Sequence, residues 1–217
     1  MIEEEKRKAA KKATSLLEKG MVVGLGTGST VAHFIDEVSS LEIADTLTFL
    51  PTSRDSERRA QAKDLKTGDI NHYLKATIGI DGADEIDPHL DLVKGGGGAL
   101  FREKVVASAS ERFVVIADTS KLVKRFSRLP VEVLPFSWKL TLGALEKMRL
   151  PGELRFSNSS PFITDNSNYI IDLDIGGIED QKALEGSLHS IPGVIETGLF
   201  IGMADVVIIG EEVRRRR

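Results

Sequence analysis

Three short polar stretches of the chain each follow an apolar run that predicts a β-strand. They are residues 24–30 (GLGTGST), 81–87 (DGADEID) and 94–98 (KGGGG). The first offers backbone N–H groups and hydroxyls to an anion, the second gathers carboxylates, and the third places a lysine beside a backbone that a ligand can approach closely. Together these groups suit a small substrate that carries a phosphate and several hydroxyls.

The stretch 24–30 differs from the two common nucleotide-binding loops. A dinucleotide-binding loop would have its third glycine where this chain has Ser29, and the next predicted strand ends without the acidic residue that binds a ribose. No lysine follows the last glycine, as it would in a P-loop. The stretch instead predicts a helix N-terminus that binds one phosphate, with a plain strand–helix turn as the alternative. The binding groups would be Thr27, Gly28, Ser29 and Thr30.

The stretch 81–87 places four carboxylates within seven residues, directly after a predicted strand. Such crowding is typical either of a divalent-cation site or of a pocket whose carboxylates bind sugar hydroxyls. Neither a calcium-loop spacing nor a histidine partner supports the metal. A solvated Asp-Gly turn is the third possibility, but Gly82 and Ala83 are too small and apolar to favour it. The sequence therefore favours the hydroxyl-binding pocket.

Lys94 and its four glycines predict an ordered loop, because apolar residues precede them and a helical pattern follows. A flexible linker is the alternative for a glycine run. Glu103 lies about a turn and a half into that helix, where its carboxylate could face the same space as Lys94. Such a pair suits proton abstraction next to a carbonyl, with the lysine stabilising the enolate. Spacing alone, however, favours a surface glutamate paired with Arg102 or Lys104.

The first half of the chain alternates apolar runs with helical patterns, as in βαβ units. We expect a mostly parallel sheet whose strands end at the polar stretches, where open sheets bind ligands. The predicted strands are 21–25, 47–50, 76–80 and 113–117, and the predicted helices include 3–19, with Gly20 as its C-cap, and 53–66.

The pattern changes after residue 125 to that of a small α+β domain. Its predicted strands are 131–134, 155–156, 169–175 and 194–197, with helices at 138–149 and 180–190. The apolar run 205–210 predicts a strand that rejoins the first sheet, and the arginines 214–217 predict a solvated, frayed tail.

Composition excludes several classes of protein. The net charge of -4 leaves no electrostatic footprint for nucleic acid, and no apolar run is long enough to span a membrane. Because the chain has no cysteine and begins with a charged segment, we expect an unexported cytoplasmic protein. Its four histidines lack metal-ligand spacing, so we expect no metal.

The motifs, in this order, resemble ribose-5-phosphate isomerases of the A type over essentially the whole chain. They are GLGTGST, DGADEID, KGGGGAL with the following FREK, ADTSK at 117–121, and the later ITDN, IPGV and TGLF segments. The resemblance implies a Rossmann-like α/β domain with a parallel sheet, similar to coenzyme A transferases, formed by residues 1–125 and 205–217. It also implies an inserted, smaller, ferredoxin-like α+β domain at 126–204 that takes part in contacts between subunits of a homodimer or homotetramer.

The same resemblance implies interconversion of D-ribose 5-phosphate and D-ribulose 5-phosphate through an enediolate, in the non-oxidative branch of the pentose phosphate pathway and without a cofactor. Glu103 matches the general base, Lys94 the group that stabilises the oxyanion, and Asp81 and Asp84 the carboxylates that hold sugar hydroxyls and assist ring opening. The implied substrate-binding residues are Thr27, Gly28, Ser29, Thr30, Gly82, Ala83, Gly95, Gly96, Gly97, Lys121 and Lys6, the last in an uncertain register.

Two other functions remain to be weighed. A sugar-phosphate sensor would use the same type of domain to bind the ligand without converting it. The whole chain is accounted for by the two predicted domains, which leaves no separate DNA-binding module and ranks this alternative below the isomerase. A nicotinamide-dependent oxidoreductase is disfavoured by the missing third glycine and acidic residue.

Overall fold

The computed structural model describes residues 1–216, which form two compact units. The first unit comprises Met1–Ala83, Arg102–Leu122 and Gly202–Arg217, and the second comprises Asp84–Phe101 and Val123–Ile201. Within the described chain, no helix combines the length and the apolar character needed to cross a lipid bilayer.

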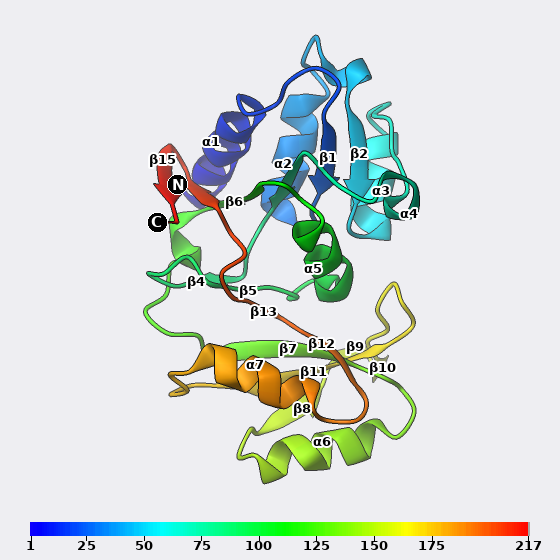
Figure 1. The fold of residues 1–217 in the computed structure, drawn as a ribbon, viewed down its shortest axis with the longest axis vertical. Helices are drawn as coiled ribbons and strands as arrows, with labels where there is room; N and C mark the ends of the chain where they lie inside the picture. The colour runs from blue at the N-terminus through cyan, green and yellow to red at the C-terminus, as the bar shows by residue number, and fades with distance from the viewer. Residues whose placement is uncertain (217) are drawn as a thin grey trace. The chain divides into compact units, whose positions relative to one another are not determined.

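A six-stranded sheet forms the centre of the first unit (Figure 1). Its order is β15 (Glu212–Arg215), β14 (Val206–Ile209), β6 (Phe113–Ala117), β3 (Ile78–Asp81), β1 (Val22–Leu25) and β2 (Thr48–Pro51). All neighbouring strands are parallel except β14 and β15. The predicted, mostly parallel sheet is therefore confirmed, and the runs after β1, β3 and β6 leave it at the same edge.

One face of this sheet is covered by α1 (Ile2–Thr14) and α2 (Ser29–Val38), which contact each other. Alternate strand residues such as Val23, Ile80 and Ile116 are fully or almost fully buried in this core. Other helical elements of the unit are η1 (Ala44–Thr46), α3 (Arg54–Gln61), α4 (Ile70–Tyr73) and η2 (Thr119–Lys121).

Two predicted helices are shorter in the structure. The first ends at Thr14 rather than at residue 19, and the Thr14 and Ser15 hydroxyls donate to the carbonyls of Lys11 and Lys12. Such bonds compete with helix propagation. The prediction of a helix over 53–66 is also wrong beyond residue 61, because Asp64 adopts a left-handed conformation and Thr67 bridges to Phe49.

The opposite face of the sheet contacts α5 (Leu100–Ser108), which starts in the second unit and continues in the first. Gly24 and Gly79 are paired in neighbouring strands and leave room for this helix. A Cβ on Gly24 would lie 2.6 Å from Val106 Cγ1, and one on Gly79 would lie 2.5 Å from Ser110 Oγ. The two glycines therefore let α5 approach the sheet closely.

The second unit contains a four-stranded antiparallel sheet covered on one face by α6 (Trp138–Lys147) and α7 (Gln181–His189). The strand order is β12 (Val194–Thr197), β7 (Arg128–Val133), β11 (Tyr169–Asp174) and β8 (Gly152–Leu154). A hairpin of β9 (Phe156–Ser157) and β10 (Ser160–Pro161) follows β8, and a small sheet joins β4 (Glu85–Ile86), β5 (Leu92–Val93) and β13 (Leu199–Phe200). The α+β character predicted for this part is confirmed.

The structure divides the chain differently from the predicted boundaries at one place. Residues 84–101 group with the second unit, because β4 and β5 pair with β13 rather than with the parallel sheet. The prediction that the polar stretches end strands of the parallel sheet is therefore wrong for residues 94–98, which follow β5. The other divisions, after Leu122 and Ile201, lie three residues from the expected ones.

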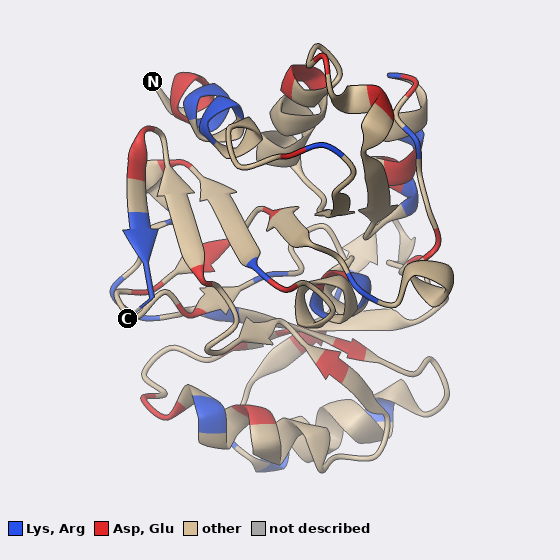
Figure 2. Ribbon diagram, turned by 45° about the horizontal axis from the view of Figure 1, so that its top comes forward, with Lys and Arg blue, Asp and Glu red and all other residues tan. Residues whose placement is uncertain are grey.

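The prediction of a frayed arginine tail is wrong for its described residues. Arg214 and Arg215 belong to β15, opposite Val207 and Val206, and form the basic end strand visible in Figure 2. The Arg216 N–H donates to the carbonyl of Asp205, which continues the pairing. Arg217 lies outside the described residues.

Candidate active site

The first predicted motif forms the turn between β1 and α2. Gly28 caps the helix with φ +116°, a conformation that favours glycine. Gly28 and Ser29 are exposed, whereas Thr30 is buried. The first-turn N–H groups and the positive end of the helix dipole thus face an open position at which a phosphate would be stabilised.

Asp81, at the end of β3, holds this turn in place. Its Oδ1 accepts hydrogen bonds from the N–H of Thr27 at 3.1 Å and from the N–H of Gly82 at 2.7 Å, and only 2% of the residue is exposed. A side chain on Gly26 would overlap the Asp81 carboxylate. The glycine is therefore needed for the carboxylate to lie against the turn, and the structure brings two of the predicted motifs together.

The Thr27 hydroxyl is directed at two residues that sequence reasoning did not assign to the site. It donates to Ser53 Oγ at 2.8 Å and lies 2.9 Å from Thr52 Oγ1. Ser53 also caps α3 by accepting from the N–H of Ser56. The sequence carries a signal for these two residues, a Thr-Ser pair between a predicted strand and a helical pattern.

The four acidic residues of the second motif have different partners. Glu85 accepts from the N–H and hydroxyl of Ser127 at 2.9 and 2.5 Å, and Asp87 accepts from two backbone N–H groups of its own turn. Asp84 Oδ2 instead accepts from the N–H of Gly96 at 2.7 Å. A side chain on Gly96 would come within 2.8 Å of Asp84 Oδ1. Asp84 and the glycine loop are therefore brought together within the second unit.

Lys94 follows β5 and is almost completely buried, with 2% of the residue exposed. Its N–H donates to the carbonyl of Gly198 at 2.9 Å, and its ammonium lies 5.7 Å from the centroid of the Phe200 ring. Burial makes an ammonium costly, and the attraction to the Phe200 ring offsets only part of this cost, so negative charge next to Lys94 is favoured.

The glycines after Lys94 form a turn in which the Gly98 N–H donates to the carbonyl of Gly95 at 2.9 Å. Gly95 and Gly98 have φ of +103° and +77°. Gly96 and Gly97 are exposed, although the loop is bounded by buried residues. The stretch is thus an ordered loop with an accessible backbone, as predicted, and not a flexible linker.

Glu103 is the fourth residue of α5, and only 5% of it is exposed. It precedes Val106, the residue that packs on Gly24, by three positions. The alternative that spacing alone favoured, a surface glutamate, is therefore wrong. A buried carboxylate fixed on a helix that cannot shift without disturbing the sheet has the rigidity that general-base catalysis needs.

Lys121 ends η2, the short helix after β6, and is half-buried. Glu5 of α1 holds that helix by accepting from the N–H and hydroxyl of Thr119 at 2.8 and 2.7 Å. These two hydrogen bonds hold the pKa of Glu5 below its usual value of 4.5. Glu5 was not predicted, and no local pattern connects it to a residue 114 positions away.

Lys6 lies on the same helix but is directed at Glu3, whose Oε1 is 2.6 Å from its ammonium. The same Glu3 carboxylate contacts His33 of α2 at 3.1 Å. Hydrogen bonds from Lys6 and then from His33 lower the pKa of Glu3. The ion pair accounts for the position of the Lys6 side chain, and its role toward a phosphate stays a prediction.

The predicted residues thus form two groups, one in each unit. The first unit holds the phosphate-loop residues, Asp81 with Gly82 and Ala83, Glu103, Lys121 and Lys6, and the second holds Asp84, Lys94 and Gly95 to Gly97. Among the described residues, a metal-type cluster occurs elsewhere, at Glu185, His189 and Glu196. There, His189 Nε2 of α7 lies 3.1 Å from Glu196 Oε1 of β12. This pairing by itself explains why the two side chains lie close together.

Comparisons with known proteins give one consistent family. Residues 48–214 match the family model of ribose 5-phosphate isomerase A, also described as phosphoriboisomerase A. The chain is 43% identical to the ribose-5-phosphate isomerase A of Gloeobacter violaceus, covering 95% of this chain and 92% of the relative. It is also 43% identical to the enzyme of that name from Korarchaeum cryptofilum, covering 99% and 97%.

Solved structures agree with these sequence relatives. A D-ribose-5-phosphate isomerase in complex with phospho-erythronic acid matches with a TM-score of 0.94, 38% identity and full coverage of both chains. The ribose 5-phosphate isomerase of Plasmodium falciparum matches with a TM-score of 0.94 and 32% identity, again over 100% of both chains.

Proposed function

Because the chain belongs to the ribose 5-phosphate isomerase A family, we propose that it interconverts D-ribose 5-phosphate and D-ribulose 5-phosphate through an enediolate, as part of the non-oxidative pentose phosphate pathway. The observation that carries the proposal is the match over almost the whole chain to relatives that bear this activity in their name. The groups that the chemistry requires are a base, an electrophile and an anchor for phosphate, and the chain supplies each of them from its own residues.

Glu103 is the proposed base. It removes the proton from C2 of the open-chain aldose, which leaves the negative charge on the C1 oxygen of an enediolate. After the hydroxyl proton has moved from the C2 oxygen to the C1 oxygen, Glu103 returns its proton to C1, so that C1 carries a hydroxyl and C2 becomes the carbonyl. Its burial on α5 supports this role, because a fixed carboxylate in a site that excludes water keeps its alignment with the carbon acid. Lys94 stabilises the negative charge that develops on the enediolate oxygen.

The remaining predicted residues bind the substrate. Asp81 and Asp84 accept hydrogen bonds from sugar hydroxyls and assist ring opening, and the first turn of α2 binds the phosphate through residues 27–30. Gly82, Ala83 and Gly95 to Gly97 present their backbone, while Lys121 and Lys6 add positive charge toward the anionic end of the substrate. The dual contacts of Asp81 support its part in this proposal, because they fix the carboxylate relative to the phosphate loop.

The test is the Glu103→Gln variant, followed by NMR in deuterated water with ribose 5-phosphate and no added metal or nucleotide. We expect wild-type protein to exchange the C2 proton and to form the ketose. The variant should lose at least about a hundredfold in both rates while keeping its affinity for the sugar phosphate. Glu111→Gln, which removes an exposed glutamate of the same unit, is the control.

Wild-type turnover in Glu103→Gln would remove this residue from the mechanism. If the wild-type protein bound the sugar phosphate tightly but showed neither exchange nor product, the isomerase assignment would fail and the protein would act as a sugar-phosphate sensor.

We also propose a homodimer or homotetramer built through the second unit, acting in the cytoplasm. Six of the exposed large apolar residues belong to that unit: Leu134, Phe136, Leu140, Met148, Phe156 and Ile163. Phe136 and Leu140 are 85% and 76% exposed, which is unfavourable in water unless a partner covers them. Light scattering should show a mass that is a multiple of 23.7 kDa for the wild type and a smaller one for Phe136→Ser with Leu140→Ser.

A further inference from the structure

Arg155, between β8 and β9 of the second unit, contacts the glycine loop from the side opposite to Asp84. Its Nη1 donates to the carbonyls of Gly95 and Gly96 at 2.9 and 3.0 Å. Its other edge makes a two-pronged ion pair with Asp172, with Nε 2.8 Å from Oδ2 and Nη2 2.5 Å from Oδ1. One planar guanidinium therefore connects a strand of the antiparallel sheet to two peptide groups of the loop.

The contact with Gly95 has a direct consequence for Asp84. The carbonyl of Gly95 and the N–H of Gly96 belong to the same peptide unit, and a trans peptide directs these groups in opposite directions. Arg155 binds one end of this unit, and Asp84 Oδ2 accepts from the other end at 2.7 Å. The guanidinium therefore determines the orientation of the N–H that holds the Asp84 carboxylate.

The contact with Gly96 acts in the same way on the next peptide unit. Since its carbonyl faces Arg155, the N–H of Gly97 is directed away from the guanidinium, to the same side as the N–H of Gly96. Two successive N–H groups on one side favour negative charge there: the first already holds the Asp84 carboxylate, and the second is directed to the same side. The positive charge of Arg155 lies behind both peptide dipoles and strengthens this effect.

The loop needs such an external support because four successive glycines have no side chains with which to fix themselves. Glycine also loses more conformational freedom on folding than any other residue. Phe162 supplies a second support, since a side chain on Gly98 would overlap its ring, and the Arg155 guanidinium lies 5.7 Å from the centroid of the same ring.

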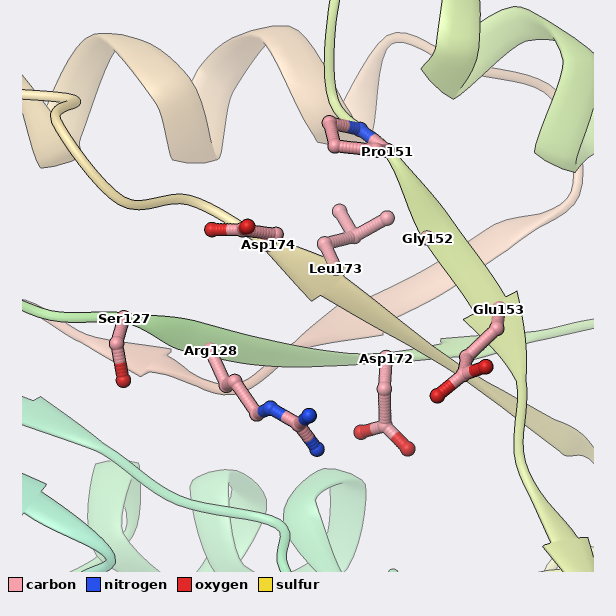
Figure 3. A pocket seen from close by; sticks show the side chains of 8 residues that line it. All are labelled: Ser127, Arg128, Pro151, Gly152, Glu153, Asp172, Leu173 and Asp174. Atoms are coloured by element: carbon pink, nitrogen blue, oxygen red, sulfur yellow. The ribbon is translucent and has the colours of Figure 1, made fainter.

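The position of the ion pair shows that it is not part of the apolar core. On β11, the Asp172 side chain points to the opposite side from Leu173, into a cavity of about 370 Å³ that Arg128 and Glu153 also line (Figure 3). The Arg155 and Asp172 side chains are 16% and 20% exposed. A second cavity of about 390 Å³, lined by Asp84, Gly96, Arg155 and Asp172 among others, makes the guanidinium accessible to small solutes.

From these contacts we infer that Arg155 is a positioning residue for the isomerisation: it orients the Gly95–Gly96 peptide group so that its N–H holds Asp84, and the Gly96–Gly97 peptide group so that its N–H is directed to the same side, toward the enediolate. Through its two hydrogen bonds, Asp172 keeps the guanidinium in the orientation in which Nη1 reaches both loop carbonyls. The inference rests on the proposed function.

The experiment measures kcat and KM for ribose 5-phosphate in Arg155→Ala, Arg155→Lys and the control Arg125→Ala. Arg125 lies in the same unit and forms an ion pair with Glu179, both being mostly exposed. We expect kcat to fall about ten- to a hundredfold in Arg155→Ala and less in Arg155→Lys, with KM changed by less than about threefold, because a misplaced loop acts mainly on the transition state. Arg125→Ala should behave like the wild type.

Two further readouts distinguish positioning from general support of the fold. Binding of phospho-erythronic acid, whose planar carboxylate resembles the enediolate, should weaken in parallel with kcat, while inhibition by inorganic phosphate should stay unchanged. Guanidinium ions at low, non-denaturing concentration should restore part of the activity of Arg155→Ala and none in the control.

The inference is overturned if the wild type isomerises and Arg155→Ala keeps the wild-type kcat. It is also overturned if Arg155→Ala weakens the binding of phospho-erythronic acid and the inhibition by inorganic phosphate to the same degree, and guanidinium restores no activity. If Arg155→Ala does not fold, kcat is measured in Arg155→Lys instead. A lysine ammonium cannot bind Asp172 and both loop carbonyls at the same time as the guanidinium does, so an unchanged kcat in this variant overturns the inference. A wild-type protein that shows no isomerisation would instead refute the proposed function.

Discussion

Gly24→Ala tests whether the rate of isomerisation depends on how closely α5 packs on the sheet. The new methyl group would lie 2.6 Å from Val106 Cγ1, whereas carbon atoms in contact are about 3.5–4.0 Å apart. We expect the helix to move by about 1 Å to relieve this contact, and it carries Glu103 three residues before Val106.

The size of the effect follows from this displacement. Overpacking of this kind lowers the free energy of unfolding by about 1–3 kcal/mol. A base displaced by about 1 Å loses roughly a hundredfold in kcat. Urea unfolding and initial rates of ketose formation measure the two effects separately, and the reasoning predicts that both occur although Glu103 itself is unchanged.

A double-mutant cycle supplies the control. Val106→Ala removes the atom that clashes, at a cost of about 2 kcal/mol for the lost burial. The double variant Gly24→Ala with Val106→Ala should be more active than Gly24→Ala alone and less destabilised than the sum of the two single changes, because the two side chains meet. Gly143→Ala in α6, where a methyl group meets nothing within 4 Å, should leave activity unchanged.

Two results would refute the reasoning. One is wild-type kcat in Gly24→Ala, which would mean that the strand yields and not the helix. The other is a loss of kcat that Val106→Ala does not relieve, which would place the disturbance elsewhere, for example at Gly79, whose Cα lies 3.2 Å from the added methyl group.

The other predictions concern two acidic residues. The pKa of Glu5 is lowered by Thr119, so its stabilising effect is present above its usual pKa of 4.5 and disappears as the pH falls through the lowered value. The thermal midpoint of the wild type should therefore exceed that of Glu5→Gln at neutral pH, with a difference that shrinks in acid; a difference that grows would contradict this. Glu132, fully buried on β7, accepts from Thr164 Oγ1 at 3.0 Å and Asn168 Nδ2 at 2.8 Å. Glu132→Leu should lower the free energy of unfolding by about 3 kcal/mol in urea, and an unchanged midpoint would show that these bonds contribute nothing net.

Local patterns were sufficient to predict much of the fold of the first unit. Short apolar runs alternating with amphipathic segments specify βα units, and the strands 22–25, 48–51, 78–81 and 113–117 occur within about two residues of their predicted places. The limits of the helices were less predictable. Thr14 and Ser15 end α1 through hydrogen bonds that no apolar periodicity reveals.

The strand β15 shows why charge alone does not predict the structure of a terminal segment. Four arginines in a row predict a solvated tail, but Arg214 and Arg215 need only the backbone of β14 to form a strand, and they leave their side chains exposed or half-buried at the end of the sheet. Pairing at an edge depends on the neighbouring strand rather than on the side chains.

The sequence by itself determined which residues could do chemistry and that each polar stretch follows a short strand, because motif order and strand-like apolar runs are written in local spacing. It did not determine that the strand before residues 94–98 belongs to a different sheet, because that depends on pairing with the distant β13. Only the tertiary structure decided how those residues are supported. It showed that Glu85 binds Ser127, that Asp87 binds the backbone of its own turn and that Asp84 binds Gly96. It also showed that Arg155 contacts the glycine loop from about 60 residues away in the sequence. Such contacts arise where distant segments pack together, and no local pattern encodes which of two identical carboxylates will meet which partner.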